Sequence, residues 1–205
     1  MPALGAQGHP HPLIARIAVA LASRESPLAE RDEPYVEAAV ALILRPRPDD
    51  DCDLLLIRRA VRAGDPWSGQ VALPGGRLSA EDESLEATAL RETREEVGLD
   101  LRREGRVLGM LSELRPRTPV LPPVIVRPYL VALHSPAAGR LVSVNEEVSE
   151  VRWVALGALF AADARRRTAV RVQGREWEVD AIQQGDFTIW GMTERILGGL
   201  EELVR

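Results

Sequence analysis

The sequence predicts an α+β fold, or a three-layer sandwich of helices and sheet, rather than a doubly wound parallel sheet. Short apolar runs of strand length recur along the chain, between segments whose apolar residues have helical spacing. Strands and helices do not alternate regularly, as a doubly wound sheet would require. With 205 residues, 45% of them hydrophobic and 28% charged, the chain fits one domain with a sizeable core.

Charge and cysteine content exclude several classes of protein. The net charge of −5 argues against a nucleic-acid binder or a membrane-surface protein, because both favour basic domains. The single cysteine, Cys52, excludes an internal disulfide and a cysteine-ligated zinc site, and it indicates a reducing compartment. No stretch approaches the roughly 18 consecutive apolar residues that a membrane helix needs. We therefore expect a cytoplasmic protein that binds neither nucleic acid nor membrane.

The first 35 residues are predicted to be an N-terminal extension of a main domain that runs over 36–205. A Pro/Gly-rich start over 1–11 precedes a short amphipathic helix over 12–23. A polar connector with Pro27 follows this helix. The sequence leaves open what the extension does, and it leaves open the oligomeric state, a homodimer included.

The first half of the main domain contains two predicted strands and one predicted helix. Apolar runs over 38–44 and 54–57 flank a Pro/Asp-rich segment, which predicts adjacent strands joined by a loop. Residues 64–76 are expected to form a loop, since they hold several glycines and prolines. A helix is predicted over 82–97, and Gly98 ends it.

The second half is predicted to be mainly strands, with a helix at its end. Three single strands are expected over 107–111, 124–133 and 150–154. Residues 169–172 and 176–181 flank Gln173-Gly174, which indicates a hairpin. A helix over 188–204 closes the chain. Its buried side is expected to contain Ile196, Leu197, Leu200 and Leu203.

Three carboxylates share one face of the helix predicted over 82–97. Glu92 is three residues from Glu95 and four from Glu96, so the three side chains lie together and repel one another. A divalent cation reverses the sign of this interaction, and hard oxygen ligands suit Mg²⁺ or Mn²⁺. The double glycine before the helix would let a backbone carbonyl approach the ion. Such a cluster on its own is more typical of a solvated acidic face.

These residues stand in a longer segment that resembles the Nudix hydrolases. The motif of that family reads G-x5-E-x7-R-E-U-x-E-E-x-G-U, with U an aliphatic residue. Residues Arg91–Leu99 match its second half, except that Thr93 replaces an aliphatic residue. A chance match to the whole set has a probability on the order of 10⁻⁴ from background frequencies.

The first half of the motif departs in register by one residue. Asp82 has the motif's distance from Gly76, whereas Glu83 has the motif's distance from Arg91. A one-residue insertion in the loop explains both distances. It leaves open which of the two carboxylates faces the metals.

The resemblance implies a fold and a set of roles. The fold would be a Nudix-type α/β/α sandwich, a mixed β-sheet between helices with the motif as a loop–helix–loop. Glu92, Glu95, Glu96 and the carbonyl of Gly76 would hold Mg²⁺ or Mn²⁺, and Arg91 would orient a glutamate through a charge-assisted hydrogen bond. The implied reaction is attack of a metal-activated water on a diphosphate.

The general base varies among Nudix hydrolases, and two residues are candidates for it here. One is Glu95 in the motif. The other is Glu147, because residues 145–153 resemble the E-V-x-E-x-x-W stretch near the last core strand of the family. An equally good interpretation of this stretch is a polar strand start with Trp153 in the core.

The substrate is implied by a closer resemblance to coenzyme A pyrophosphatase-like members. Residues Gly69–Gly76 and Ile189–Leu197 resemble the corresponding segments of those proteins. The first expectation is hydrolysis of coenzyme A or acyl-CoA to 3′,5′-ADP and a phosphopantetheine product. ADP-ribose, dinucleotides and nucleoside triphosphates are alternative substrates. A nucleotide-sensing Nudix module without turnover is an alternative of another class, which the complete set of carboxylates disfavours.

Arginines are expected to bind the phosphates of such a substrate. Arg59 fits the first arginine of the family's R-S-x3-R-x3-G-x3-F-P-G-G pattern, but Gly64 or Asp65 stands where the second arginine belongs. Arg62 is a nearby substitute, although a solvated loop charge is the commoner role of such a residue. Trp190 has two interpretations, stacking on an adenine or packing in the core, and the scarcity of aromatic residues favours the core.

Overall fold

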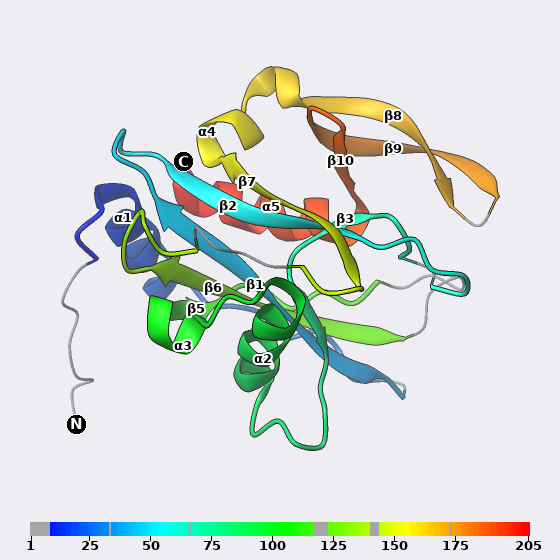
Figure 1. Cartoon of the computed structure of the whole chain (residues 1–205), viewed down its shortest axis with the longest axis horizontal. Helices are drawn as coiled ribbons and strands as arrows, with labels where there is room; N and C mark the ends of the chain where they lie inside the picture. The colour runs from blue at the N-terminus through cyan, green and yellow to red at the C-terminus, as the bar shows by residue number, and fades with distance from the viewer. Residues whose placement is uncertain (1–8, 33, 66, 117–122, 140–143, 173) are drawn as a thin grey trace.

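The structure is a computed structural model that describes residues 9–32, 34–65, 67–116, 123–139, 144–172 and 174–205. A mixed sheet forms its centre (Figure 1). Its seven strands are β1 (Val36–Pro46), β2 (Cys52–Arg59), β3 (Val71–Ala72), β4 (Gly75–Arg77), β5 (Gly105–Met110), β6 (Val124–Leu133) and β7 (Val148–Ala155). Strand β1 is parallel to β6 and antiparallel to β2 and β4. The prediction of a mixed rather than a parallel sheet is therefore confirmed.

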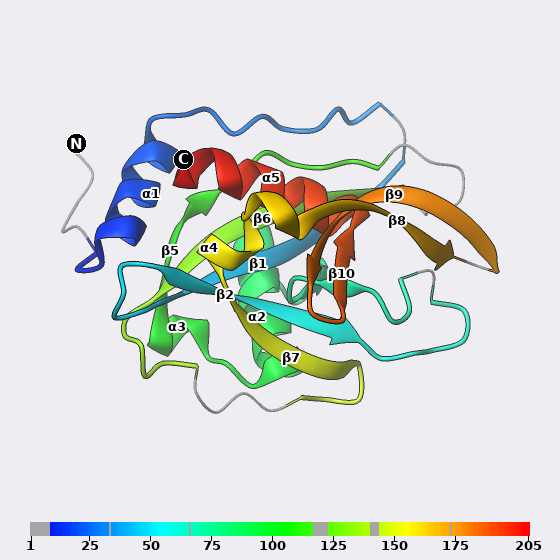
Figure 2. The same cartoon turned by 90° about the horizontal axis from the view of Figure 1, so that it is seen from above.

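Helices cover both faces of this sheet, as the predicted sandwich requires. Helices α2 (Leu85–Val97) and α3 (Leu101–Glu104) pack on one face, in a core with alternate residues of β1 such as Ala41 and Ile43. Helices α1 (Pro12–Ala22) and α5 (Gly191–Val204) pack on the other face. These two helices lie side by side (Figure 2). Each face of the sheet thus has its own apolar core, because successive strand residues point to opposite sides.

A second sheet stands on the α5 side of the molecule. It consists of β8 (Arg165–Val172), β9 (Arg175–Gln184) and β10 (Phe187–Trp190), and α4 (Leu156–Leu159) and a short 3₁₀ helix (Ala162–Ala164) lead into it. Strands β8 and β9 project beyond the main sheet as a long hairpin (Figures 1 and 2). The predicted hairpin is confirmed, although Gln173 lies outside the described residues.

Two predicted helix starts are wrong. The helix predicted from Asp82 begins at Leu85, because the hydroxyl of Ser84 accepts a hydrogen bond from the backbone N–H of Ala87 at 3.1 Å and caps it. The helix predicted from Thr188 begins at Gly191, because residues 188–190 pair with β9 as strand β10. The predicted end at Gly98 is confirmed, since this glycine caps α2 in the left-handed region with φ 70°.

The N-terminal extension packs tightly on the main domain. Four apolar residues of α1 are buried: Leu13, Ile14, Ile17 and Leu21. Beyond α1, the carboxylate of Glu113 accepts hydrogen bonds from the backbone of Ala29 at 2.8 Å and from Arg31 at 3.0 Å. Arg127 of β6 bonds the same carboxylate at 2.8 Å. No helix among the described residues has the length and apolar character to traverse a bilayer.

Candidate active site

The double glycine of β4 lies directly under α2 and decides how close the helix can come. A Cβ on Gly76 would lie 2.4 Å from the carboxyl carbon of Glu92, so only glycine leaves room for that side chain. Gly75 has φ 152°, and a Cβ there would meet the carbonyl oxygen of Ala39 at 2.2 Å. Its backbone N–H donates to Glu96 at 2.9 Å. The two glycines thus fix two of the motif carboxylates against the sheet.

The three motif glutamates differ in their exposure to solvent. Glu96 is buried at 2% exposure, and this burial raises the pKa of its carboxyl to about 7. Burial also raises the pKa of Glu92, although the Arg91 guanidinium opposes the shift. Glu95 is exposed at the rim of the site. Glu92 thus has Arg91 as a counter-charge, whereas the more deeply buried Glu96 has no ion-pair partner among the described residues.

Arg91 connects the glutamates to the loop before the helix. Its Nη1 donates to Glu92 at 2.8 Å and to Glu95 at 3.0 Å. Its Nε and Nη2 each donate to Asp82 at 2.9 Å, a bidentate pair that holds the pKa of Asp82 well below its ordinary value. The structure thus places Asp82 against Arg91 and leaves Glu83 exposed at the surface.

Glu147 is brought to this cluster from a distant part of the chain. The backbone N–H of Asn145 donates to the carbonyl of Glu96 at 3.2 Å, and the Asn145 side chain accepts from the Glu147 N–H at 2.8 Å. The carbonyl of Glu147 accepts from Ala60 at 2.8 Å. Its charge contributes to raising the pKa values of Glu92 and Glu96, so it stands near both.

The two arginines expected to bind substrate are both held by carboxylates. Arg59 donates to Asp65 at 2.9 Å, and its charge partly offsets the raised pKa of Glu96. Arg62 donates to Glu147 at 3.0 Å. Asp65 stands at one of the positions where the pattern has its second arginine, and here it neutralises Arg59 instead.

The structure also locates residues that sequence reasoning missed or left undecided. Asn145 forms an Asx turn two residues before Glu147, a spacing that could have identified it. Trp153 packs beside the core on the α2 face, under the guanidinium of Arg45 at 4.1 Å. Trp190 is only partly buried and lines a cavity, so the preference for a core role is wrong.

The donor chemistry of this site fits a divalent cation. Glu92, Glu95 and Glu96 supply hard oxygen atoms, and Gly76 lies beneath Glu92 with its carbonyl as a further donor. In the part of the chain that the structure describes, no three acidic or imidazole side chains already converge on one point. Arg91 bonds one oxygen of Glu92 and one oxygen of Glu95, which leaves the second oxygen of each carboxylate to meet an ion.

Comparisons with known proteins agree with this geometry. The model of the NUDIX domain family matches residues 34–173. An uncharacterized Nudix hydrolase NudL of Photorhabdus laumondii is 33% identical over 173 residues, which cover 83% of this chain and 85% of that protein. NudL of Yersinia pestis (strain Pestoides F) is 32% identical over 80% of this chain and 77% of its own length.

Two further comparisons have a narrower meaning. The uncharacterized protein C14C4.10c of Schizosaccharomyces pombe is 36% identical over 120 residues, which are 57% of this chain but only 36% of that longer protein. A MutT/nudix family protein from Enterococcus faecalis has a similar structure, with a TM-score of 0.53 at 20% identity over 93% of this chain and 69% of that one. The latter likeness shows the fold.

Proposed function

The chain belongs to the Nudix hydrolases, and from that premise we propose that it hydrolyses the diphosphate bond of a nucleotide derivative with Mg²⁺ or Mn²⁺. The observation that carries this proposal is the packing of Glu92 and Glu96 against the double glycine, with the charge of Glu147 acting on both. A buried carboxylate cluster without a matching number of cations favours binding of a metal ion over a purely structural role.

The proposed ligands of the ion are Glu92, Glu95, Glu96 and the carbonyl of Gly76. When bound, the ion neutralises phosphate charge and lowers the pKa of a water molecule. The protein contributes orientation: Asp82 holds Arg91, and Arg91 in turn fixes the direction of the motif glutamates. This arrangement holds the carboxylates in place before the substrate binds. A preorganised site is faster because its charged groups need not reorganise during the reaction.

We propose Glu147 as the base that takes the proton of the attacking water, with Glu95 as the alternative. Glu95 is bound by Arg91. Glu147 is bound by Arg62 on a partly exposed loop, so its carboxylate can turn into the site. Glu147→Gln tests this assignment, because loss of the base lowers kcat by about 10²- to 10⁴-fold. A Glu147→Gln variant that keeps the unmodified kcat would assign the role to Glu95, which is also a proposed ligand of the ion.

The proposed substrate is coenzyme A or an acyl-CoA, cleaved to 3′,5′-ADP and a phosphopantetheine product. Its support is the resemblance of Gly69–Gly76 and of Ile189–Leu197 to coenzyme A pyrophosphatase-like proteins. Arg59 and Arg62 would bind phosphate by exchanging their present carboxylate partners, Asp65 and Glu147. The substrate would thereby free Glu147 from its ion pair as it binds.

A turnover assay across substrates tests this proposal. Coenzyme A, ADP-ribose, diadenosine polyphosphates and nucleoside triphosphates are offered with Mg²⁺, with Mn²⁺ or with a chelator. Chelator-sensitive cleavage that is selective for coenzyme A, and that is lost in Glu96→Gln, is the expected result. Cleavage of another compound refutes the coenzyme A proposal. Absence of all turnover, with metal-dependent nucleotide binding, refutes hydrolysis.

A further inference from the structure

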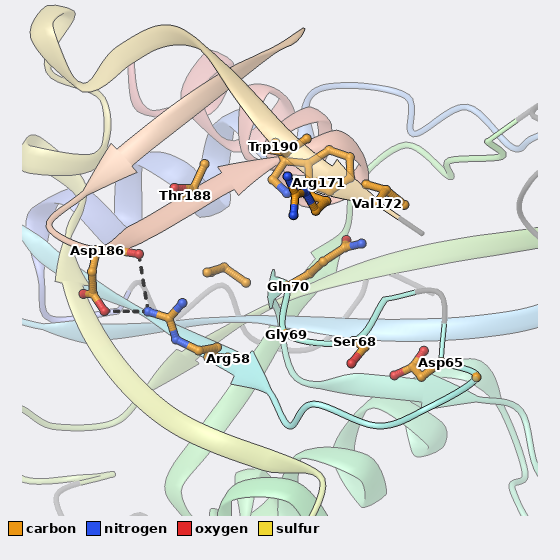
Figure 3. Close-up of a pocket in the computed structure, with 13 residues that line it drawn as sticks. Arg58, Asp65, Ser68, Gly69, Gln70, Arg171, Val172, Asp186, Thr188 and Trp190 are labelled. Carbon is orange, nitrogen blue, oxygen red and sulfur yellow. Dashed lines mark hydrogen bonds and ion pairs between the residues drawn. The ribbon is translucent and has the colours of Figure 1, made fainter. Parts of the chain in front are cut away.

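A cavity of about 550 Å³ opens between the main sheet and the second sheet (Figure 3). We call it the β8–β10 pocket. Residues 68–71 and Asp65 form one wall, and Arg171, Thr188 and Trp190 form the opposite wall. Its volume lies within the range of about 300–1,000 Å³ that is usual for small-molecule sites.

The pocket is joined to the carboxylate cluster through two residues. Asp65 lines the pocket and accepts hydrogen bonds from Arg59. The charge of Arg59 in turn acts on Glu96. Arg58, the residue next to Arg59, lines the pocket from β2. A ligand in the pocket therefore lies beside the Asp65–Arg59 pair, whose arginine stands near enough to Glu96 for its charge to act there.

The charged residues of the pocket are not equally available to a ligand. Arg58 donates to Asp186 at 2.7 Å and to Glu150 at 3.2 Å, and its guanidinium lies 4.5 Å from the ring centre of Phe187. Its charge is therefore neutralised inside the protein. Arg171, by contrast, makes no ion pair with any residue that the structure describes, and it is exposed.

An indole and an available guanidinium thus lie on the same wall of one cavity. Figure 3 shows Trp190 and Arg171 on the same side of the cavity, with Gln70 on the other side. An aromatic ring binds a nucleobase by stacking, whatever the base. A guanidinium binds phosphate through paired hydrogen bonds. The combination fits a nucleotide better than it fits an apolar ligand or a free anion.

We propose that the β8–β10 pocket binds the nucleoside monophosphate end of the substrate, with Trp190 against the base and Arg171 against a phosphate. This inference rests on the proposed function for its choice of ligand class. It adds two specificity residues that lie outside the Nudix motif, on β10 and β8. The proposal also assigns a role in substrate binding to the second sheet, because both residues belong to that sheet.

Calorimetric titration of the full-length protein tests the pocket apart from catalysis. The titrants are 5′-AMP and adenosine, in the presence of EDTA so that no metal ion holds the phosphate. We expect Trp190→Leu to weaken AMP binding by about 5- to 150-fold, the loss of one base–aromatic stack. Trp190→Phe, which keeps a ring, restores most of the affinity. Arg171→Ala weakens AMP binding about tenfold and leaves adenosine binding unchanged.

Two matched variants on the same hairpin serve as controls. Trp177 of β9 is an exposed tryptophan that does not line the pocket, and Arg167 is an exposed arginine on the same strand as Arg171. Trp177→Leu and Arg167→Ala are expected to bind AMP as the unmodified protein does. Equal affinity in Trp190→Leu and the unmodified protein would overturn the proposal. So would full competition by inorganic phosphate without any binding of adenosine.

The same variants distinguish failure of this inference from failure of the proposed function. If AMP binding depends on Trp190 but no diphosphate is cleaved with Mg²⁺ or Mn²⁺, the hydrolase proposal fails and the pocket stands. If cleavage occurs and neither KM nor AMP binding responds to Trp190→Leu, the pocket fails and the hydrolase proposal stands.

Discussion

Replacing Gly76 by alanine tests whether the position of the Glu92 carboxylate depends on the absence of a side chain at residue 76. The new Cβ would lie 2.4 Å from the Glu92 carboxyl carbon, and ordinary contact begins at 3.4 Å, so the carboxylate must move by about 1 Å. A misplacement of this size in a catalytic group can cost about 10²-fold in rate. That factor corresponds to about 2.7 kcal/mol of activation free energy. We expect kcat with Mg²⁺ to fall by this factor in Gly76→Ala.

The fold should tolerate this change. The atoms that the new methyl meets are the far end of a flexible glutamate, and no positive φ is recorded at Gly76. The free energy of unfolding, from urea denaturation, should therefore change by no more than about 1 kcal/mol. Gly75→Ala is the matched contrast, because its methyl would meet the Ala39 backbone at 2.2 Å with φ at 152°. We expect that variant to lose its folded structure.

The assay is steady-state turnover on the substrate that the panel identifies, together with titration of Mn²⁺ followed by electron paramagnetic resonance. Gly76→Ala should show weaker Mn²⁺ binding as well as slower turnover. A folded Gly76→Ala protein that binds Mn²⁺ and turns over within twofold of the unmodified enzyme would refute the reasoning.

Three further predictions follow from the contacts around the site and the extension. Asp82→Asn should lower kcat about tenfold by loosening Arg91, with KM unchanged, and a change in KM alone would contradict this. Glu147→Gln should lower kcat by about 10²- to 10⁴-fold without weakening Mn²⁺ binding if Glu147 is the base, and an unmodified kcat would contradict this. Burial raises the pKa of Glu113, but hydrogen bonds from Arg31, Ala29 and Arg127 outweigh burial and lower the pKa below its ordinary value of 4.5. The stability that the Glu113 carboxylate contributes is therefore present above pH 4.5 and is lost as the pH falls below that value. Glu113→Gln should accordingly reduce unfolding free energy at pH 7 by about 3 kcal/mol and by less in acid, and equal losses at both pH values would count against it.

Local signals in the sequence predicted much of the fold. Gly98 predicts the end of α2, because a glycine readily adopts the left-handed conformation in which the backbone N–H groups after a helix bond its last carbonyls. The start of α2 was harder, since Asp82 and Ser84 are both good caps and only the observed hydrogen bond to Ala87 selects between them. Strand β10 was missed because Thr188 and its neighbours form a strand only through pairing with β9, a contact that no local pattern contains.

The site shows the same division between local and distant information. Glu92, Glu95 and Glu96 could be grouped from helical spacing alone. The position of Glu147 depends on backbone bonds to Ala60 and to the end of α2, which join segments far apart in the chain. Helical spacing therefore cannot predict that Glu147 lies near the motif glutamates, and only the family resemblance of residues 145–153 indicates it.

The acidic residues around the motif have a common electrostatic consequence. Asp82 and Asp65 each accept two hydrogen bonds from one guanidinium, Asp82 from Arg91 and Asp65 from Arg59. Among the described residues, Glu96 receives only the Gly75 N–H, and no guanidinium bonds to it. Burial raises the pKa of its carboxyl to about 7, and the Gly75 N–H and the charge of Arg59 offset this only in part. Were either aspartate absent, an arginine could turn to Glu96 and occupy the place that we propose for a metal ion. The aspartates therefore keep the cluster negative, which is the condition that binding of a divalent cation requires.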